Sequence, residues 1–434
     1  MSASAATSNI STSTASTGGF KNNLPLIIGI AGLVIAVLGM LVGMGGEHPT
    51  SRPGVSLLLG FSFWFAVLIG MLFLIQMWYL FDAGWSVIVR RQLEHMIGGF
   101  PLLAGIFLLV LFVPMLVSDN TGVMWKWLNP SQDYHGTPIS EDALWLAKSE
   151  YLNASFFYIR VVLYFAILSG IAALLRKFSF RNDHQPNVAN VSAARKMSAL
   201  GIILTALVTT FAAFDFYMSL SYHWFSTMYG VWFFTVCMRT GLAATILLCN
   251  YLAFAGPLKG IYRQPHNYLL ACLSLAFTVF WAYISFSQYF LIYNANIPEE
   301  TFWYNLRELA PNGDKSQWWY VSLVLIFCNF FIPFLMLLFY KTKVVIKRLL
   351  FIQVWILVFC LLDLYFNIVP NKVHADNPYG YDIVPFLSGH IFFDLAAVVG
   401  VGGIVIWAGL RSMQKTEPIP IHDPRIQESI HYSE

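Results

Sequence analysis

Ten long apolar runs limit what this sequence can fold into. Each run is long enough to cross the roughly 30 Å hydrocarbon core of a bilayer. They lie near residues 24–44, 55–81, 97–117, 152–175, 197–221, 228–254, 268–292, 318–340, 349–369 and 385–410. A membrane-spanning segment must satisfy its own backbone hydrogen bonds, so each run is predicted to be an α-helix. The ten-residue alternating segments of a β-barrel do not occur, and the predicted fold is an all-α polytopic membrane protein.

The composition agrees with this prediction and excludes other classes. Of the 434 residues, 58% are hydrophobic and only 11% are charged, whereas about 25% of a soluble domain is charged. Such a chain cannot cover a water-facing surface with polar groups, which excludes a soluble globular enzyme. The net charge of +3 is too small to indicate a nucleic-acid partner. The five cysteines lie in apolar runs without a C-x-x-C or C-x-x-C-H motif, so no disulfide, zinc, iron–sulfur or covalent haem site is indicated.

Three regions are predicted along the chain. Residues 1–23 are mostly Ser, Thr, Ala and Gly and form a flexible tail. Residues 24–410 form the ten-helix membrane domain, and residues 411–434, with three prolines, form an extended tail. A signal peptide is the alternative at the N-terminus. The run at 24–44 is long for a signal peptide and no cleavage site stands out, so a retained helix is favoured.

Positive charge is distributed unevenly over the two sides of the predicted bundle. The N-terminal tail, the connections after helices 2, 4, 6 and 8, and the C-terminal tail together hold 17 Lys and Arg. The remaining connections hold 6. Positively charged segments stay on the cytoplasmic side of a membrane, so both termini are predicted to be cytoplasmic.

Ionisable residues inside the predicted helices are the candidate functional groups, because a charge within a membrane costs several kcal/mol. Most of them fall in the outer half of the helices, which indicates one hydrated cavity open to the outside. The candidates for a proton path or quinone site are Arg160, Asp215, His223, Arg239, Asp363, His390 and Asp394. Three acids accompany two arginines, so one carboxylate is expected to lack a cationic partner.

The inner half has fewer such groups. Asp82, Glu94 and His95 lie at its boundary and are the candidates for a proton path from the cytoplasmic side. They belong to the amphipathic segment 82–96, which also carries Arg90 and Arg91. This segment is predicted to lie along the lipid headgroups.

Two interpretations of the buried charges stay open. Asp and His side chains could hydrogen-bond a quinol hydroxyl and carry its protons. The arginines could equally pair with the acids only to lock helices together. A haem held by two histidines is weakly supported, since His223 and His390 are single and both outer.

Glycines are dense in the first and last predicted helices and predict close helix packing. They are Gly39, Gly43, Gly400, Gly402 and Gly403. Packing within the chain is favoured over a role at a subunit interface.

Three segments carry a recognisable pattern. They read AGWSVIVRRQLEHM at 83–96, FDFYMSLSYHWFSTMYGVWFF at 214–234 and PIPIHDPRIQESIHYSE at 418–434. In these segments the chain resembles the F subunit, the second quinone-related membrane subunit, of bacterial alternative complex III. The wider family is the polysulfide-reductase membrane-subunit type. The resemblance covers nearly the whole chain, and the second and third segments are fairly specific.

This resemblance implies a subunit of a quinol:electron-acceptor oxidoreductase in the respiratory chain of a bacterial inner membrane. It implies two four-helix bundles, helices 2–5 and 6–9, flanked by helices 1 and 10. It also implies a scaffold without a cofactor of its own, with polar residues that conduct protons and with quinone contact possible. Partner subunits, including a paralogous membrane subunit and an iron–sulfur subunit, would hold iron–sulfur clusters and haem c, and lipids would surround the chain.

The second segment, at 214–234, is where the resemblance bears on individual residues. Asp215 and His223 fall within it and Arg239 falls beside it. Ser221 and Tyr222 stand where related sequences more often carry an acidic residue and Pro, which leaves the role of a carboxylate there open.

Two other classes of protein remain as alternatives. A secondary transporter with a polar site in the outer half of the membrane predicts helices broken at matching places in two halves. Pro101, Pro114 and Pro333 are not in corresponding places. A purely structural anchor predicts that the buried charges are inert pairs.

Overall fold

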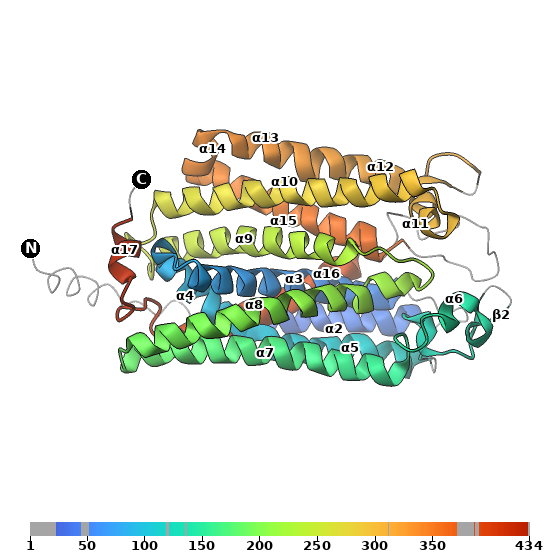
Figure 1. Cartoon of the computed structure of the whole chain (residues 1–434), viewed down its shortest axis with the longest axis horizontal. Helices are drawn as coiled ribbons and strands as arrows, with labels where there is room; N and C mark the ends of the chain where they lie inside the picture. Colours follow the sequence, from blue (N-terminus) through green and yellow to red (C-terminus); the bar gives the residue numbers. More distant parts are fainter. Residues whose placement is uncertain are drawn as a thin grey trace, which may run out of the picture.

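Ten helices in the described part of the chain are long and apolar enough to cross a membrane, and they run side by side along the molecule (Figure 1). The computed structural model describes residues 23–44, 52–118, 121–134, 137–310, 312–370, 386 and 390–432. The predicted all-α polytopic membrane fold is confirmed, and each predicted apolar run corresponds to one of these helices. The tail predicted at 1–23 lies outside the described residues except for Asn23.

The long helices are joined by short helical and extended pieces. The α-helices are α2 Leu24–Met44, α3 Arg52–Leu80, α4 Val87–Met96, α5 Phe100–Ser118, α6 Ala143–Leu146, α7 Ala154–His184, α8 Val188–Phe216, α9 Tyr229–Ala255, α10 Gln264–Ala295, α11 Pro298–Glu308, α12 Gln317–Val324, α13 Ile332–Leu338, α14 Tyr340–Val344, α15 Ile346–Ile368, α16 Ile391–Lys415 and α17 Ile426–Ile430. Short 3₁₀ turns are η2 Gly84–Ser86, η3 Ile97–Gly99, η4 Lys126–Leu128, η5 Ile139–Glu141 and η6 Met218–Ser221, and η7 Leu325–Phe331 is a π-helix between α12 and α13. Strands β1 Asp133–Tyr134 and β2 Thr137–Pro138 form a small antiparallel pair in which Asp133 lies opposite Pro138.

The long helices form two four-helix groups that meet mainly through α3 and α9. Helices α3, α5, α7 and α8 pack around one another, and α9, α10, α15 and the α12–η7–α13 helix form the second group. Helix α3 packs against α9 and joins the groups, while α2 and α16 pack against each other and against α3. The two bundles with flanking first and last helices, which the resemblance implied, are therefore present.

Small residues allow the closest helix contacts. A Cβ atom on Gly70 of α3 would collide with the backbone of Cys237 on α9, and Gly241 faces Gly70 in the same way. A Cβ atom on Gly32 of α2 would lie 2.7 Å from the Cα atom of Gly400 on α16. The predicted role of Gly400 in packing within the chain is confirmed. Gly39 meets Phe393, Gly402 meets Trp64 and Gly403 meets Gly29, all within this chain.

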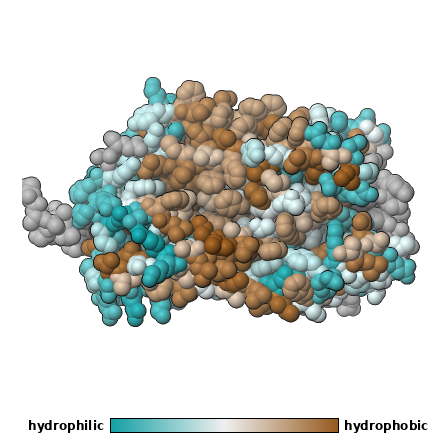
Figure 2. All heavy atoms as spheres, in the orientation of Figure 1, coloured by the Kyte–Doolittle hydropathy of each residue, from teal (hydrophilic) through white to brown (hydrophobic). Residues whose placement is uncertain are grey.

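The two ends of the molecule differ in structure. The tail end, named here for the C-terminal tail, carries α4 and α17, and the loop end carries α6 and α11 (Figure 1). Figure 2 shows hydrophobic side chains across the middle of the visible face and hydrophilic side chains gathered at both ends. Large apolar side chains such as Val162 and Phe286 are more than 60% exposed there. An apolar belt between two polar ends is what a lipid bilayer requires.

Two predictions about the tail end are wrong. Segment 82–96 does not lie along the headgroups, because every residue of α4 is buried between the long helices and the C-terminal tail. The tail is not wholly extended from residue 411. Helix α16 continues to Lys415, and α17 forms at Ile426–Ile430. Pro418, Pro420 and Pro424 lie between these helices, which is where a proline disrupts helical structure.

Candidate functional site

Arg160 and Asp215 form a buried ion pair between α7 and α8 near the loop end. The guanidinium donates through Nε to Oδ2 at 2.7 Å and through Nη2 to Oδ1 at 3.0 Å. The Tyr164 hydroxyl donates to Oδ2 at 2.6 Å. Arg160 also donates to the Tyr151 carbonyl at 2.9 Å and lies over that ring. The carboxylate is fully buried, and a bidentate pair with a third donor satisfies it.

Asp394 of α16 pairs with Arg52 at the start of α3. The two guanidinium–carboxylate contacts are 2.5 Å and 3.0 Å, and the Ser56 hydroxyl donates to Oδ1 at 2.5 Å. Arg52 also donates to the Tyr365 hydroxyl at 3.3 Å. Arg52 lies three residues before the apolar run at 55–81, so the sequence alone places it in a connection. Only the extension of α3 back to residue 52 shows that it is a partner of Asp394.

His390 lies directly before α16, one helical turn from Asp394. Burial and the nearby Arg52 guanidinium lower the pKa of His390, and the Asp394 carboxylate opposes this shift. The imidazole belongs to the same cluster as the Arg52–Asp394 pair.

Asp363 and Arg239 lie in the second bundle, around the indole of Trp281. Asp363 of α15 accepts hydrogen bonds from the indole N–H groups of Trp281 at 2.8 Å and Trp232 at 3.2 Å. The Arg239 guanidinium lies 5.0 Å from the centre of the Trp281 ring and donates to the Asn329 carbonyl at 2.7 Å. One carboxylate was expected to lack a cationic partner. Among the residues that the structure describes, Asp363 is the candidate acid with no directly bonded arginine.

Several donors in this second-bundle cluster are unused. Nε and Nη1 of Arg239 and both polar atoms of the Asn329 side chain are buried, with no hydrogen-bond partner in the described part of the chain. Asn329 belongs to the π-helix η7. Single π-helical turns inside α-helices occur frequently at functional sites. Buried unsatisfied polar groups of this kind are where internal water or a ligand is expected.

His223 bonds to Asp142 at the loop end, outside the helices. Its Nε2 lies 2.5 Å from Oδ2 of Asp142, and the Tyr222 hydroxyl donates to the same oxygen at 2.8 Å. Partial burial raises the pKa of Asp142, but hydrogen bonds from His223, Tyr222 and the Leu144 amide outweigh it, so the pKa lies below its ordinary value. This contact ties the loop before α6 to the loop between α8 and α9.

The seven outer candidates do not share a single set of contacts. Their charged groups bond within separate clusters: Arg160 with Asp215, Arg52 with Asp394, and Asp363 with two tryptophans. His223 bonds to a loop acid instead. In the described part of the chain these bonds form three helix–helix clusters and one loop contact, and the convergence of all seven residues on one outer cavity stays a prediction. Among the described residues, Nε of Arg52 is also buried without a partner, but Asp394 is bound by that same arginine. In the second-bundle cluster the unpartnered donors of Arg239 lie beside an acid that is bound by neutral groups.

Glu94 is the centre of a fourth cluster, at the tail end. It accepts hydrogen bonds from the Tyr79 hydroxyl at 3.0 Å and the Ser179 hydroxyl at 2.5 Å. The Arg90 and Arg91 guanidinium groups lie 3.5 Å and 3.7 Å from its oxygens. Beyond them, Arg91 forms two 2.7 Å contacts with Asp183, and Arg90 forms one of 2.6 Å with Asp423 of the C-terminal tail. The charges of α4 are thus satisfied by α7 and by the tail.

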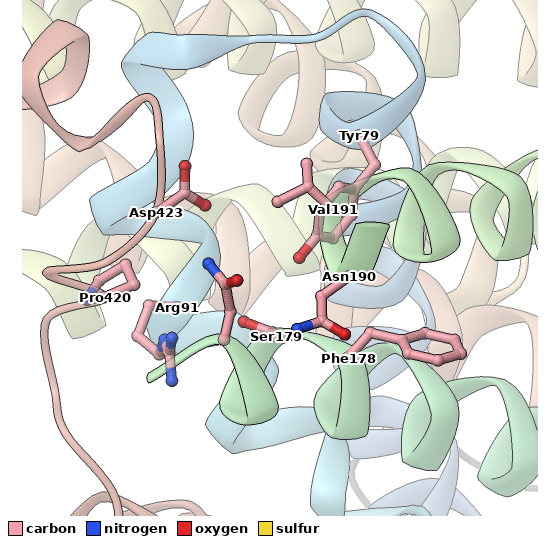
Figure 3. Close-up of a pocket in the computed structure, with 9 residues that line it drawn as sticks. Tyr79, Arg91, Phe178, Ser179, Asn190, Val191, Pro420 and Asp423 are labelled. Atoms are coloured by element: carbon pink, nitrogen blue, oxygen red, sulfur yellow. The ribbon is translucent and has the colours of Figure 1, made fainter. Parts of the chain in front are cut away.

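A small pocket opens beside this cluster, with room for about one water molecule. Figure 3 shows its lining side chains, which come from α3, α4, α7, α8 and the tail. They are Tyr79, Arg91, Phe178, Ser179, Asn182, Asn190, Val191, Pro420 and Asp423. The burial of Asp183 and Asp423 could not be predicted from the apolar pattern, because neither lies in an apolar run.

The other two inner candidates are placed differently. The His95 Nδ1 lies 3.0 Å from the Ser412 hydroxyl of α16, and its ring stacks on Phe180. Asp82 is largely exposed and pairs with Arg195 and Arg425. Glu94 and His95 are therefore buried in the bundle, whereas Asp82 belongs to its surface.

Two of the three recognisable segments pack against each other. Segment 83–96 forms η2 and α4, and segment 418–434 crosses it as the tail. The amide of Gln92 donates to the Pro418 carbonyl at 2.8 Å, and the Ser429 hydroxyl donates to the Trp85 carbonyl at 2.7 Å. Residues more than 300 positions apart thus form one folded unit at the tail end.

The fold and the clusters define a class, a multi-pass α-helical membrane protein with buried ionisable groups. No protein-family model matches the chain, and no curated protein matches it. Among the described residues, no three His, Cys, Asp or Glu side chains gather where they could hold a metal ion. The function is therefore argued from the clusters themselves.

Proposed function

We propose that the chain is an integral subunit of a quinol-oxidising respiratory complex of the alternative complex III type. In this role it is a scaffold whose buried carboxyl groups conduct protons, with quinone contact possible. Partner subunits, among them a paralogous membrane subunit and an iron–sulfur subunit, carry the iron–sulfur clusters and haem c. The chain lies in a bacterial inner membrane with both termini in the cytoplasm.

One observation carries the proton role: Asp363 is held by two neutral indoles, while donors of Arg239 and Asn329 beside it have no partner among the described residues. A carboxylate in a bidentate pair with arginine is fixed in its charged state. Asp363 has no such bond, so both of its protonation states are accessible. The unused donors provide positions for water that would carry a proton.

The resemblance supports the respiratory role, and the packing of its segments is consistent with it. Segments 83–96 and 418–434 build one unit around α4, which surrounds Glu94 with hydroxyl and guanidinium groups. Glu94 is the candidate for proton entry from the cytoplasmic side, and Asp363 lies in the second bundle.

The first test is to solubilise the protein from its own membrane in mild detergent. Co-purification with subunits that carry haem and iron–sulfur clusters is expected. A chain that purifies alone and binds a small solute would contradict the proposal and favour a secondary transporter.

The second test replaces Asp363 by Asn in the assembled complex. Asn keeps the shape and accepts the indole hydrogen bonds but cannot exchange a proton. Proton release coupled to quinol oxidation is expected to fall at least tenfold, a size typical of losing a positioned proton-transfer group. Asp314→Asn, an exposed loop acid away from the candidate residues, is the control and should leave proton release unchanged. Unchanged proton release in Asp363→Asn would indicate that the buried charges are only structural pairs.

A further inference from the structure

The hairpin formed by α13, α14 and α15 carries an unbalanced positive charge at the tail end. Lys341, Lys347 and Arg348 are exposed there, in or beside the short helix α14. No ion pair or side-chain hydrogen bond is found for these three side chains within the described ranges. The sequence contains no acidic residue between Asp314 and Asp363, so no acid of this hairpin can neutralise them.

These charges lie at the edge of the apolar belt. Helix α14 connects the membrane span Gln317–Leu338 to the span Ile346–Ile368. The side chains next to the charges are large, apolar and exposed, and they extend along α13 and α15. They are Leu335, Leu338, Phe339, Tyr340, Phe351 and Val354. A group of cations next to an exposed apolar surface is complementary to a molecule with an anionic head and hydrocarbon chains.

The hairpin is fixed rather than loose. Lys343, the fourth cation, is buried, and its ammonium donates to the Cys272 sulfur at 3.4 Å and lies 5.1 Å from the Tyr268 ring. Tyr268 of α10 also packs on Tyr340, with ring centres 5.5 Å apart. Contacts to α10 therefore hold α14 in place and set the position of the exposed cations.

The N-terminus of α15 also favours a bound anion. Its first turn contains no acidic residue, and no side chain caps its N-terminus. Lys347 and Arg348 lie in this first turn, where the positive end of the helix dipole disfavours cations. A bound anion would offset both the dipole and the two side chains.

We propose that this hairpin binds an anionic phospholipid, with its phosphate between Lys341, Lys347 and Arg348 and its acyl chains along α13 and α15. Basic clusters next to a membrane span are typical sites for such headgroups. The lipid neutralises the hairpin and extends the apolar belt over its exposed aromatic side chains. This inference is independent of the respiratory role.

The test uses the full chain with whatever subunits accompany it, washed in detergent until loosely held lipid is lost. Retained phosphatidylglycerol is measured by mass spectrometry, and its affinity is measured by titration back into the washed protein. The test variant carries Lys341→Gln, Lys347→Gln and Arg348→Gln. The matched control carries Lys177→Gln, Arg181→Gln and Lys196→Gln, three exposed cations of α7 and α8 at the same end.

Each removed cation is expected to weaken phosphatidylglycerol binding about fivefold, so the triple variant should lose roughly a hundredfold. The control triple should bind like the parent. If the triple variant does not insert into the membrane, Lys347→Gln and Arg348→Gln alone should each show the fivefold loss.

Three results would overturn the proposal. The first is equal affinity in the test triple and the parent. The second is equal affinity for phosphatidylcholine, which would mean that apolar contact alone holds the lipid. The third is displacement of the lipid by inorganic phosphate at the same concentration, which would indicate a small-anion site instead.

Discussion

At the scale of single residues, the buried ion pairs differ in how much the fold depends on them. Asp215 accepts three hydrogen bonds, two from Arg160 and one from Tyr164. Removing one member of a buried pair leaves the other charge uncompensated, which costs more than the pair contributes as a whole. Replacing Asp215 therefore tests how much the stability of the fold depends on this ion pair.

Replacing Asp215 by Asn is expected to destabilise the protein by about 3 kcal/mol, because Arg160 then stays buried without a counter-charge. Tyr164→Phe removes one hydrogen bond to the same carboxylate and should cost about 1–2 kcal/mol. Tyr158→Phe on the same helix removes only a 3.8 Å contact with the Met115 sulfur and is the control. Unfolding in detergent measures all three. A cost for Asp215→Asn no larger than that for Tyr158→Phe would contradict the ion-pair assignment.

The Asp142–His223 contact should depend on pH. The pKa of Asp142 is lowered in the folded protein. Its stabilising effect is therefore complete above the unfolded-state pKa of about 3.9 and is lost as the pH falls through the lower folded-state pKa. The protection of amides in segment 143–152 against hydrogen exchange, corrected for the slower intrinsic exchange at acidic pH, should fall in that range. In Asp142→Asn the exchange should already be fast at pH 6, and an unchanged rate there would rule out this contact as the anchor of the loop.

The sequence predicts the burial of charges inside the apolar runs but not which groups they bond. Asp394 lies in an apolar run, so its burial was evident. Its partner Arg52 precedes another run by three residues, where the apolar pattern predicts a connection and not a buried group. Asp363 is bound by Trp281 and Trp232, side chains that an apolar pattern assigns simply to the core. Pairing depends on which helices are neighbours, and hydrophobicity alone does not determine neighbours.

At the scale of elements, α4 shows where periodicity is ambiguous. Its charged residues Arg90, Arg91 and Glu94 recur one helical turn apart, as in a helix lying on a membrane surface. Here Asp183 and Asp423 cover the charged side instead of water. Periodicity reveals that one side of a helix is polar, but it does not reveal whether solvent or other charged residues cover that side. The ten spans were predictable because twenty apolar residues in a row admit few alternatives.

The α3–α9 contact should be intolerant of even one added methyl group. Gly70→Ala places a Cβ atom against the Cys237 backbone and is expected to destabilise the protein by about 1–3 kcal/mol through overpacking. Gly170→Ala on α7 is the control, because nothing lies within 4 Å of its added Cβ atom. That change should stabilise helix α7 by about 0.5–1 kcal/mol. Thermal unfolding of both variants measures the difference, and equal midpoints would mean that the two bundles separate easily.

At the scale of the whole molecule, the two polar ends carry different charge. The connections that hold most of the Lys and Arg, such as those after α7, α9 and α13, all lie at the tail end (Figure 1). The loop end carries acidic residues such as Glu141, Glu299 and Glu300. The alternation of the ten spans places every second connection at the same end, so the count of positive charges assigns an orientation to the entire bundle.

The tail end is accordingly expected to face the cytoplasm. Gln185→Cys places an exposed thiol in the connection between α7 and α8, and Glu141→Cys places one before α6 at the loop end. In intact cells a membrane-impermeant maleimide should label Glu141→Cys and not Gln185→Cys, and permeabilised cells should label both. The parent chain corrects for its own cysteines, three of which are buried. The opposite labelling pattern would mean that the bundle has the inverse orientation in the membrane. Glu94 would then lie on the outer side and could not be an entry point for cytoplasmic protons.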